Sequence, residues 1–232
     1  MADDFAEQVA GVAALAEPVR RDLYRYVVAQ PDAVSRDQAS AGIGVPRHTA
    51  KFHLDRLVDE GLLDTEFRWL TGRQGPGAGR PTKLYRRSGR EVSVSVPERR
   101  YDLAGQLMAS AIEESARDGV PVRRSLHRVA VALGARLGAG ARTSAGRRPS
   151  RDTLVEAACS VLARHGYEPR REGRRVTLAN CPFHALATEH TELVCEMNLA
   201  LVSAVAEHSC DQRLAARLDP ADGRCCVVLD AG

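Results

Sequence analysis

The sequence predicts an α+β protein with an N-terminal helical region that ends in a hairpin, a helical middle segment and a C-terminal α+β region. Helical spacing followed by a basic, Gly/Pro-rich stretch fills the first 90 residues, and two amphipathic segments follow over 98–138. All six cysteines lie after residue 158. At 232 residues, 44% hydrophobic and 27% charged, the chain is long enough to bury two small cores. These proportions exclude a disordered chain, a collagen and a coiled-coil rod.

The apolar stretches are too short for a membrane protein. The longest strongly apolar run, Leu199 to Ala206, falls far short of the ~20 residues that a membrane helix needs. The opening MADDFAEQ is acidic and has no apolar core of the secretory kind. We therefore expect a cytoplasmic protein without membrane contact, in a reducing compartment where structural disulfides are rare.

The first region carries signals for a particular order of elements. Pro18 suits the first turn of a helix, and Ser35 with Gln38 forms a capping box that opens a short helix. A longer helix is expected over about 46–60, and strands at 62–69 and 83–87. Helix, short helix, turn, longer helix and two-stranded hairpin is the order of a winged helix-turn-helix.

Two segments of this region resemble known bacterial regulators. LAEPVRRDLYRYV is similar to the second helix of ArsR-type and MarR-type regulators, and VPRHTAKFHLDRLVDEGLL resembles their recognition helix. Related DeoR-type domains share this arrangement. The resemblance covers roughly residues 10–90 and implies a domain over 1–97 that binds double-stranded DNA.

The outward side chains of the longer helix and the hairpin are the candidate DNA contacts. Residues near the start of a recognition helix reach base edges, whereas later basic residues meet phosphates. The wing tip is basic and suits the minor groove or phosphates, because nine Arg or Lys against two acids lie between Phe67 and Arg100. The predicted contacts are Arg47, His48, Thr49 and Lys51 near base edges, His53 and Arg56 at phosphates, and Arg73, Arg80 and Lys83 on the wing.

The middle segment is expected to dimerise the protein. Apolar residues follow helical spacing from Tyr101 to Arg117 and again from Val122 to Leu137. Winged domains of this kind usually read two half-sites as dimers, which favours a homodimer with at least one helix of 98–138 at its interface. Core helices of the second region are the alternative. The small, basic residues 139–150 predict a flexible linker.

The last region, 151–232, carries the thiols. We expect a helix over 153–165, a strand pair, a long buried helix over 189–208 and a final strand pair. Four of the cysteines fall on different elements, so only tertiary folding could bring them together. Clustered thiols in a reducing compartment favour metal, cluster or redox chemistry. Cys159 is read as a core residue.

The segment NCPFHALATEHTELVC, with the wide cysteine spacing after it, resembles the C-terminal region of SufR-like iron–sulfur-sensing repressors. This resemblance implies a cluster, 4Fe-4S in type, on Cys181, Cys195, Cys210 and Cys225. Cys226 competes with Cys225, because neighbouring strand residues face opposite sides. His184 is a spare ligand candidate.

Three alternatives stay open for the function. The thiols could hold zinc, with His184 and His190 as further ligands, or the region could sense a small molecule with incidental cysteines. A thiol-redox enzyme is the third, with Cys225 beside Arg224 as its candidate nucleophile. No nucleophile elbow, phosphate loop, metalloprotease motif or dinucleotide fingerprint is present in the sequence, so we expect a regulator without enzyme activity.

Overall fold

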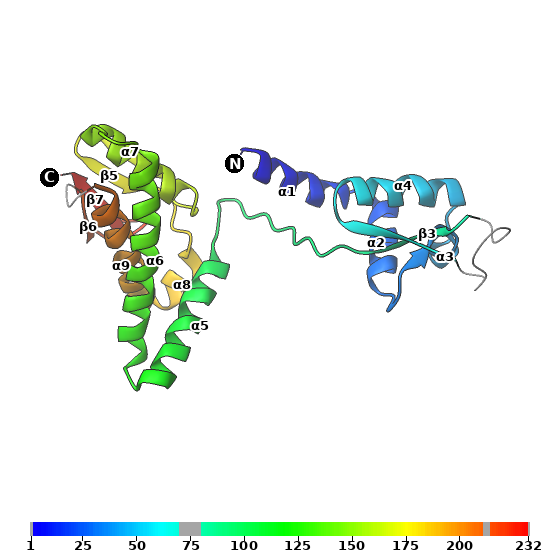
Figure 1. Ribbon diagram of the computed structural model, residues 1–232, viewed down its shortest axis with the longest axis horizontal. Helices are drawn as coiled ribbons and strands as arrows, with labels where there is room; N and C mark the ends of the chain where they lie inside the picture. The colour runs from blue at the N-terminus through cyan, green and yellow to red at the C-terminus, as the bar shows by residue number, and fades with distance from the viewer. Residues whose placement is uncertain (1, 70–79, 211–213, 232) are drawn as a thin grey trace. The chain divides into compact units, whose positions relative to one another are not determined.

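The computed structural model describes residues 2–69, 80–210 and 214–231. The chain divides into two compact units, Met1–Val94 and Ser95–Gly232 (Figure 1). Each unit has its own hydrophobic core. We describe them separately as unit 1 and unit 2.

Unit 1 packs helices against a small antiparallel sheet. Its elements are α1 (Ala2–Ala14), α2 (Pro18–Val28), β1 (Val34–Ser35), α3 (Arg36–Ile43), α4 (Arg47–Asp59), β2 (Leu63–Arg68) and β3 (Thr82–Arg87). The strand order is β1-β3-β2, and Thr65 pairs with Tyr85 at the centre of the hairpin. Leu23, Leu54 and Leu57 are fully buried between the helices. This is the expected winged helix-turn-helix order, with helix α1 and the short strand β1 as additions.

Local signals explain where these helices begin and how closely they pack. Glu17 caps α2 by accepting hydrogen bonds from the backbone N–H groups of the first turn. The Ser35–Gln38 capping box is confirmed at the start of α3. A Cβ atom on Gly42 would lie 2.1 Å from the ring of Tyr26, so α3 approaches α2 as closely as a glycine allows.

Unit 2 combines long helices with a four-stranded antiparallel sheet of order β4-β5-β7-β6. Its helices are α5 (Tyr101–Asp118), α6 (Val122–Ser144), α7 (Arg151–Ala163), α8 (His184–Glu189) and α9 (Thr191–Cys210). Its strands are β4 (Pro169–Glu172), β5 (Arg175–Leu178), β6 (Leu214–Leu218) and β7 (Val227–Ala231). The elements expected in the last region are thus present, and α8 is an addition.

Helices α6 and α9 run in the same direction and touch through small residues. A Cβ atom on Gly134 would lie 2.3 Å from the carbonyl oxygen of Leu201, and one on Gly138 would lie 2.6 Å from that of Val205. The contacts advance together along both helices, which fixes their parallel course. Backbone therefore meets backbone at this crossing, and only glycine fits there.

Two expectations about the middle of the chain need correction or revision. The predicted linker over 139–150 is wrong for its first half, because α6 continues through Ser144 and buries Ala141 in the core. Helices α5 and α6 also share one core with the cysteine region, through residues such as Leu107 and Leu126. Unit 2 therefore joins the segments 98–138 and 151–232 in one body. None of the described helices is long and apolar enough to cross a membrane.

Candidate functional site

The outward face of α4 offers exposed basic side chains at its start. The side chains of Arg47 and Lys51 are 71% and 62% exposed, and His48 is exposed beside them. Arg47 lies 3.3 Å from a carboxylate oxygen of Asp37, and Lys51 lies 3.2 Å from one of Asp55. Exposed ion pairs of this kind are worth only ~0–1 kcal/mol, so DNA phosphates or base edges can replace the carboxylates.

The middle of the same face carries an apolar group. Phe52 is 66% exposed, and its ring stands edge-on to the ring of His53 at a centroid distance of 5.2 Å. An exposed aromatic side chain on a recognition helix can contact the methyl group of a thymine. Thr49 is half-buried, and Arg56 pairs with Glu60 at 2.5 Å near the end of the helix.

The structure places His53 away from this face. Its side chain is only 12% exposed, and Nδ1 lies 3.5 Å from Oε2 of Glu17, the residue that caps α2. This position leaves His53 little surface for the phosphate contact that the sequence suggested. The histidine instead helps to hold α4 against the start of α2.

Strand β3 is fixed to the recognition helix through Asp55. Lys83 Nζ and the Tyr85 hydroxyl both donate to Oδ1 of Asp55, at 2.7 and 2.9 Å. Burial raises the pKa of Asp55, but the hydrogen bonds from Lys83, Tyr85 and Lys51 outweigh it and leave that pKa below its ordinary value. Burial and the bond to Asp55 raise the pKa of Tyr85. Arg80 is exposed at the start of the return strand, while Arg73 lies outside the described residues.

Unit 2 gathers four thiols from three separate stretches of chain. Cys181 follows β5, Cys195 lies on α9, and Cys225 and Cys226 immediately precede β7. The Sγ atoms of Cys195 and Cys226 lie 2.7 Å apart, and the Cys225 thiol hydrogen-bonds with those of Cys181 and Cys226. We call these four residues the thiol cluster. Three of them are buried, and Cys226 is half-buried.

The pKa values of the thiols in this cluster are shifted in different directions. Burial and the contact with Cys226 raise the pKa of Cys195 to about 12. The bond from Cys225, together with a backbone N–H of Phe183, lowers the pKa of Cys181 despite its burial. Cys181 therefore gives up its proton most readily, and thiolate is the form that binds metals.

Both Cys225 and Cys226 enter the cluster because the chain bends there. Strand β7 begins only at Val227, so the alternation of strand side chains does not apply to the two cysteines. The backbone N–H of Cys225 donates to Leu178 O at 2.9 Å, and the carbonyl of Cys226 accepts from Asp219 at 2.7 Å. From the sequence, we expected only one of these two cysteines to join the other thiols, whereas in the fold both of them do.

Cys210 does not join the cluster. Helix α9 continues through Cys210, so this residue follows Cys195 by 15 positions on one helix, about 22 Å along the axis. Cys210 is 1% exposed, and burial together with the nearby Cys210 raises the pKa of Cys159, which places Cys210 by that core residue. Of the four predicted ligands, Cys181, Cys195 and Cys225 lie together with Cys226, and Cys210 lies elsewhere, while the ligand role itself stays a prediction.

A buried hydrogen-bond network supports the cluster from α9. The Tyr167 hydroxyl donates to Oδ1 of Asn198 at 2.5 Å, and Nδ2 of Asn198 donates to Sγ of Cys225 at 3.2 Å. The backbone N–H of Val227 lies 3.5 Å from the same sulfur. N–H donors aimed at a sulfur stabilise its thiolate form and tune any metal it binds. The sequence alone gave no sign of Tyr167 or Asn198.

The arrangement differs from a simple metal-ion site. Across the described ranges, no three His, Cys, Asp or Glu side chains are disposed to hold a single metal ion. His184 is exposed at the first position of α8. The donor chemistry of four thiols suits an iron–sulfur cluster, because soft sulfur ligands match iron.

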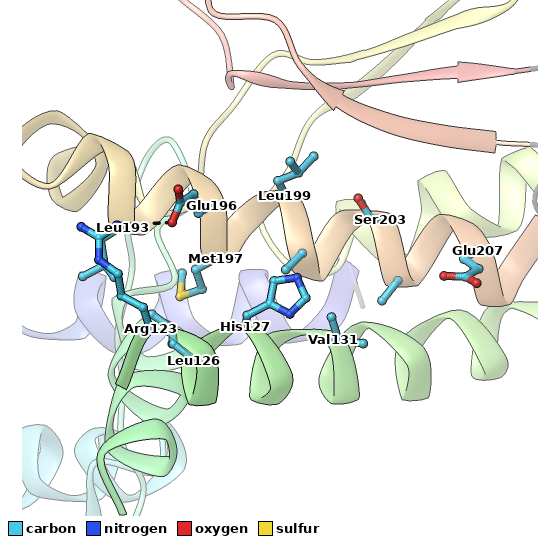
Figure 2. Close-up of a pocket in the computed structure, with 12 residues that line it drawn as sticks. Arg123, Leu126, His127, Val131, Leu193, Glu196, Met197, Leu199, Ser203 and Glu207 are labelled. Atoms are coloured by element: carbon cyan, nitrogen blue, oxygen red, sulfur yellow. Dashed lines mark hydrogen bonds and ion pairs between the residues drawn. The ribbon is translucent and has the colours of Figure 1, made fainter. Parts of the chain in front are cut away.

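A separate groove of about 410 Å³ lies between α6 and α9. Figure 2 shows the ring of His127 between the two helices and the pair of Arg123 with Glu196 at one end. Met197 and Val131 contribute apolar walls.

Comparison with known proteins identifies the class of unit 1. The model of a family described as a helix-turn-helix domain matches residues 15–66, which include α2, α3 and α4. No curated protein matches the chain. Together with the exposed basic start of α4, the match supports a DNA-binding transcriptional regulator of the helix-turn-helix class.

Proposed function

We propose that the protein is a transcriptional repressor whose affinity for its operator depends on an iron–sulfur cluster bound by unit 2. The observation that carries this proposal is the convergence of Cys181, Cys195, Cys225 and Cys226 in a protein whose other unit is a DNA reader. We assign these four thiolates as the ligands. This set differs from the one that the resemblance to SufR-like repressors implied, because Cys226 takes the place of Cys210.

The surroundings of the thiols favour a cluster. An iron–sulfur cluster, when bound, supplies a centre that oxidants and iron scarcity destroy. Four thiolates repel one another unless donors and a cationic centre offset their charge. Asn198 Nδ2 and the backbone N–H of Val227 already point at Cys225, and that of Phe183 hydrogen-bonds with Cys181. Hydrogen bonds to sulfur of this kind set the reduction potentials of iron–sulfur proteins.

DNA recognition is assigned to α4 and the wing of unit 1. We propose that the protein acts as a homodimer, because two recognition helices are needed to read a symmetric operator. Arg47, His48 and Lys51 contact base edges or neighbouring phosphates, and Arg80 belongs to the wing contact. Much of the affinity comes from released counterions, so binding weakens steeply as salt rises.

The test is to purify the protein without oxygen and to measure its absorption spectrum, iron and acid-labile sulfide. An operator is then selected from a random DNA library, and its affinity is measured before and after the cluster is removed with a chelator. A brown protein with iron and sulfide in equal amounts, and a change in affinity on cluster loss, is expected. A colourless protein with stoichiometric zinc would instead favour the zinc alternative.

A further inference from the structure

The segment by which the chain enters unit 2 is bonded to the loop that carries Cys181. The Arg99 guanidinium donates to the carbonyl of Cys181 at 3.1 Å and also to Oδ1 of Asn180. The amide of Asn180 in turn donates to the carbonyl of Glu98 at 2.8 Å. The backbone N–H of Arg100 donates to Pro182 at 2.9 Å. Segment 98–100 and loop 180–182 therefore move together.

The side-chain amide of Asn180 is buried and hydrogen-bonded within this connection. It is 6% exposed, and its amide nitrogen also donates to the carbonyl of Gly166 at 2.6 Å. Its oxygen accepts from Arg99. A buried amide that loses one of these partners leaves a polar atom unsatisfied, which destabilises the arrangement.

The other side of the connection is fixed to unit 1. The backbone N–H of Ser93 donates to Oε1 of Gln8 on α1 at 3.0 Å. The Arg90 guanidinium donates to the carbonyl of Glu60, at the end of the recognition helix, at 3.1 Å. Only residues 94–97 lie between the two sets of bonds, and four residues span at most about 14 Å. The segment between the two sets of bonds, which we call the tether, is therefore short.

We propose that Arg99 and Asn180 are positioning residues that transmit the state of the thiol cluster to the DNA-binding unit. This inference rests on the proposed function. While Cys181 is held as a ligand, loop 180–182 and segment 98–100 stay fixed and hold the tether in one direction. When the ligand is lost, the loop and the tether loosen, and the paired recognition helices lose their spacing. The connection is thus a coupling between two sites through one ordered segment.

The test uses the full chain and two matched variants, Arg99→Gln and Arg100→Gln. Both remove one positive charge, but the Arg100 side chain pairs with Asp102 and Glu98 inside its own segment. Three quantities are measured: iron and sulfide content, the ratio of operator affinities with and without the cluster, and hydrogen exchange in peptides covering 94–101. If Arg99→Gln fails to fold, Arg99→Lys replaces it, because lysine keeps the positive charge but lacks the planar guanidinium group.

We expect all variants to carry as much iron and sulfide as the wild type. In the wild type and in Arg100→Gln, cluster removal changes the affinity by about fivefold or more and speeds exchange over 94–101. In Arg99→Gln the ratio falls towards one, and exchange is already fast with the cluster bound. An Arg99→Gln protein with the full ratio overturns this coupling and leaves the proposed function intact. A wild type without a cluster overturns both.

Discussion

The Sγ atoms of Cys195 and Cys226 lie 2.7 Å apart, although 31 positions separate the residues in sequence. This contact joins the first turns of α9 to the bend before β7. With the bond between Cys225 and Cys181, it ties together helix, bend and loop. Loop 180–182 contains Cys181, and the carbonyl of Cys181 accepts a hydrogen bond from Arg99 at the start of unit 2. Contacts within unit 2 thus link the thiols to the segment by which the chain enters that unit.

Arg47 and His53 should separate DNA affinity from stability. Arg47→Ala should weaken operator binding by about 1–3 kcal/mol and leave unfolding nearly unchanged, because the side chain is 71% exposed and we assign it a base-edge contact. His53→Ala should lower the urea midpoint with a smaller effect on binding, because its ring packs beside Glu17. Anisotropy titrations and urea melts measure the two effects. If the His53→Ala protein is as stable as the wild type but binds the operator more weakly, His53 contacts DNA and this account of its role is wrong.

Gly134 should be intolerant of even a methyl group. Gly134→Ala places a Cβ atom 2.3 Å from the carbonyl oxygen of Leu201, so α6 and α9 must separate, at a cost of about 1–3 kcal/mol. Gly140→Ala is the matched control on the same helix, because its Cβ meets nothing within 4 Å. That substitution should raise the free energy of unfolding by about 0.5–1 kcal/mol. Equal effects in urea melts would contradict the close helix contact.

Tyr167→Phe should destabilise unit 2 and disturb the thiol cluster. It leaves Oδ1 of the buried Asn198 without its donor, a loss of about 1–3 kcal/mol in the free energy of unfolding. Tyr101→Phe provides the comparison, because Tyr101 is 41% exposed and its hydroxyl accepts only a long bond, 3.3 Å, from Ala185. Thermal unfolding followed by circular dichroism measures both. A Tyr167→Phe protein as stable as the wild type would show that Asn198 finds another donor.

Asp55 should make the stability of unit 1 depend on acid pH. Its folded-state pKa lies below the ordinary value of 3.8. The stabilisation by the charged carboxylate is therefore complete above that ordinary value and is lost as the pH falls through the lower folded-state pKa. Urea melts between pH 5 and 3, followed by the fluorescence of Trp69, report on this unit. Asp55→Asn should be less stable at pH 5 and should show a shallower decline, and an unchanged decline would assign the effect to other carboxylates.

Unit 1 was predictable because its signals are local. The Ser35–Gln38 capping box and the turn at Gly61 mark helix ends directly in the sequence, and both are present. The burial of His53 was not predictable, because it depends on Glu17 from another helix. Helical spacing places a side chain on a face but does not say which neighbour covers that face.

The thiol cluster was predictable as a gathering of cysteines but not in its membership. The sequence placed Cys210 at the end of the long helix, and the full course of α9 shows that 15 helical positions keep its thiol away from that of Cys195. Cys225 and Cys226 meet because a bend replaces regular strand there, which sequence alternation cannot reveal.

The most direct measurement of the central claim is iron and sulfide content after anaerobic reconstitution of four proteins: wild type, Cys226→Ser, Cys210→Ser and Cys159→Ser. The thiol cluster predicts that Cys210→Ser and Cys159→Ser load like the wild type, with the same absorption spectrum, and that Cys226→Ser loads poorly or loses its iron quickly. Full loading of Cys226→Ser together with an empty Cys210→Ser protein would contradict the assignment of the four thiolates.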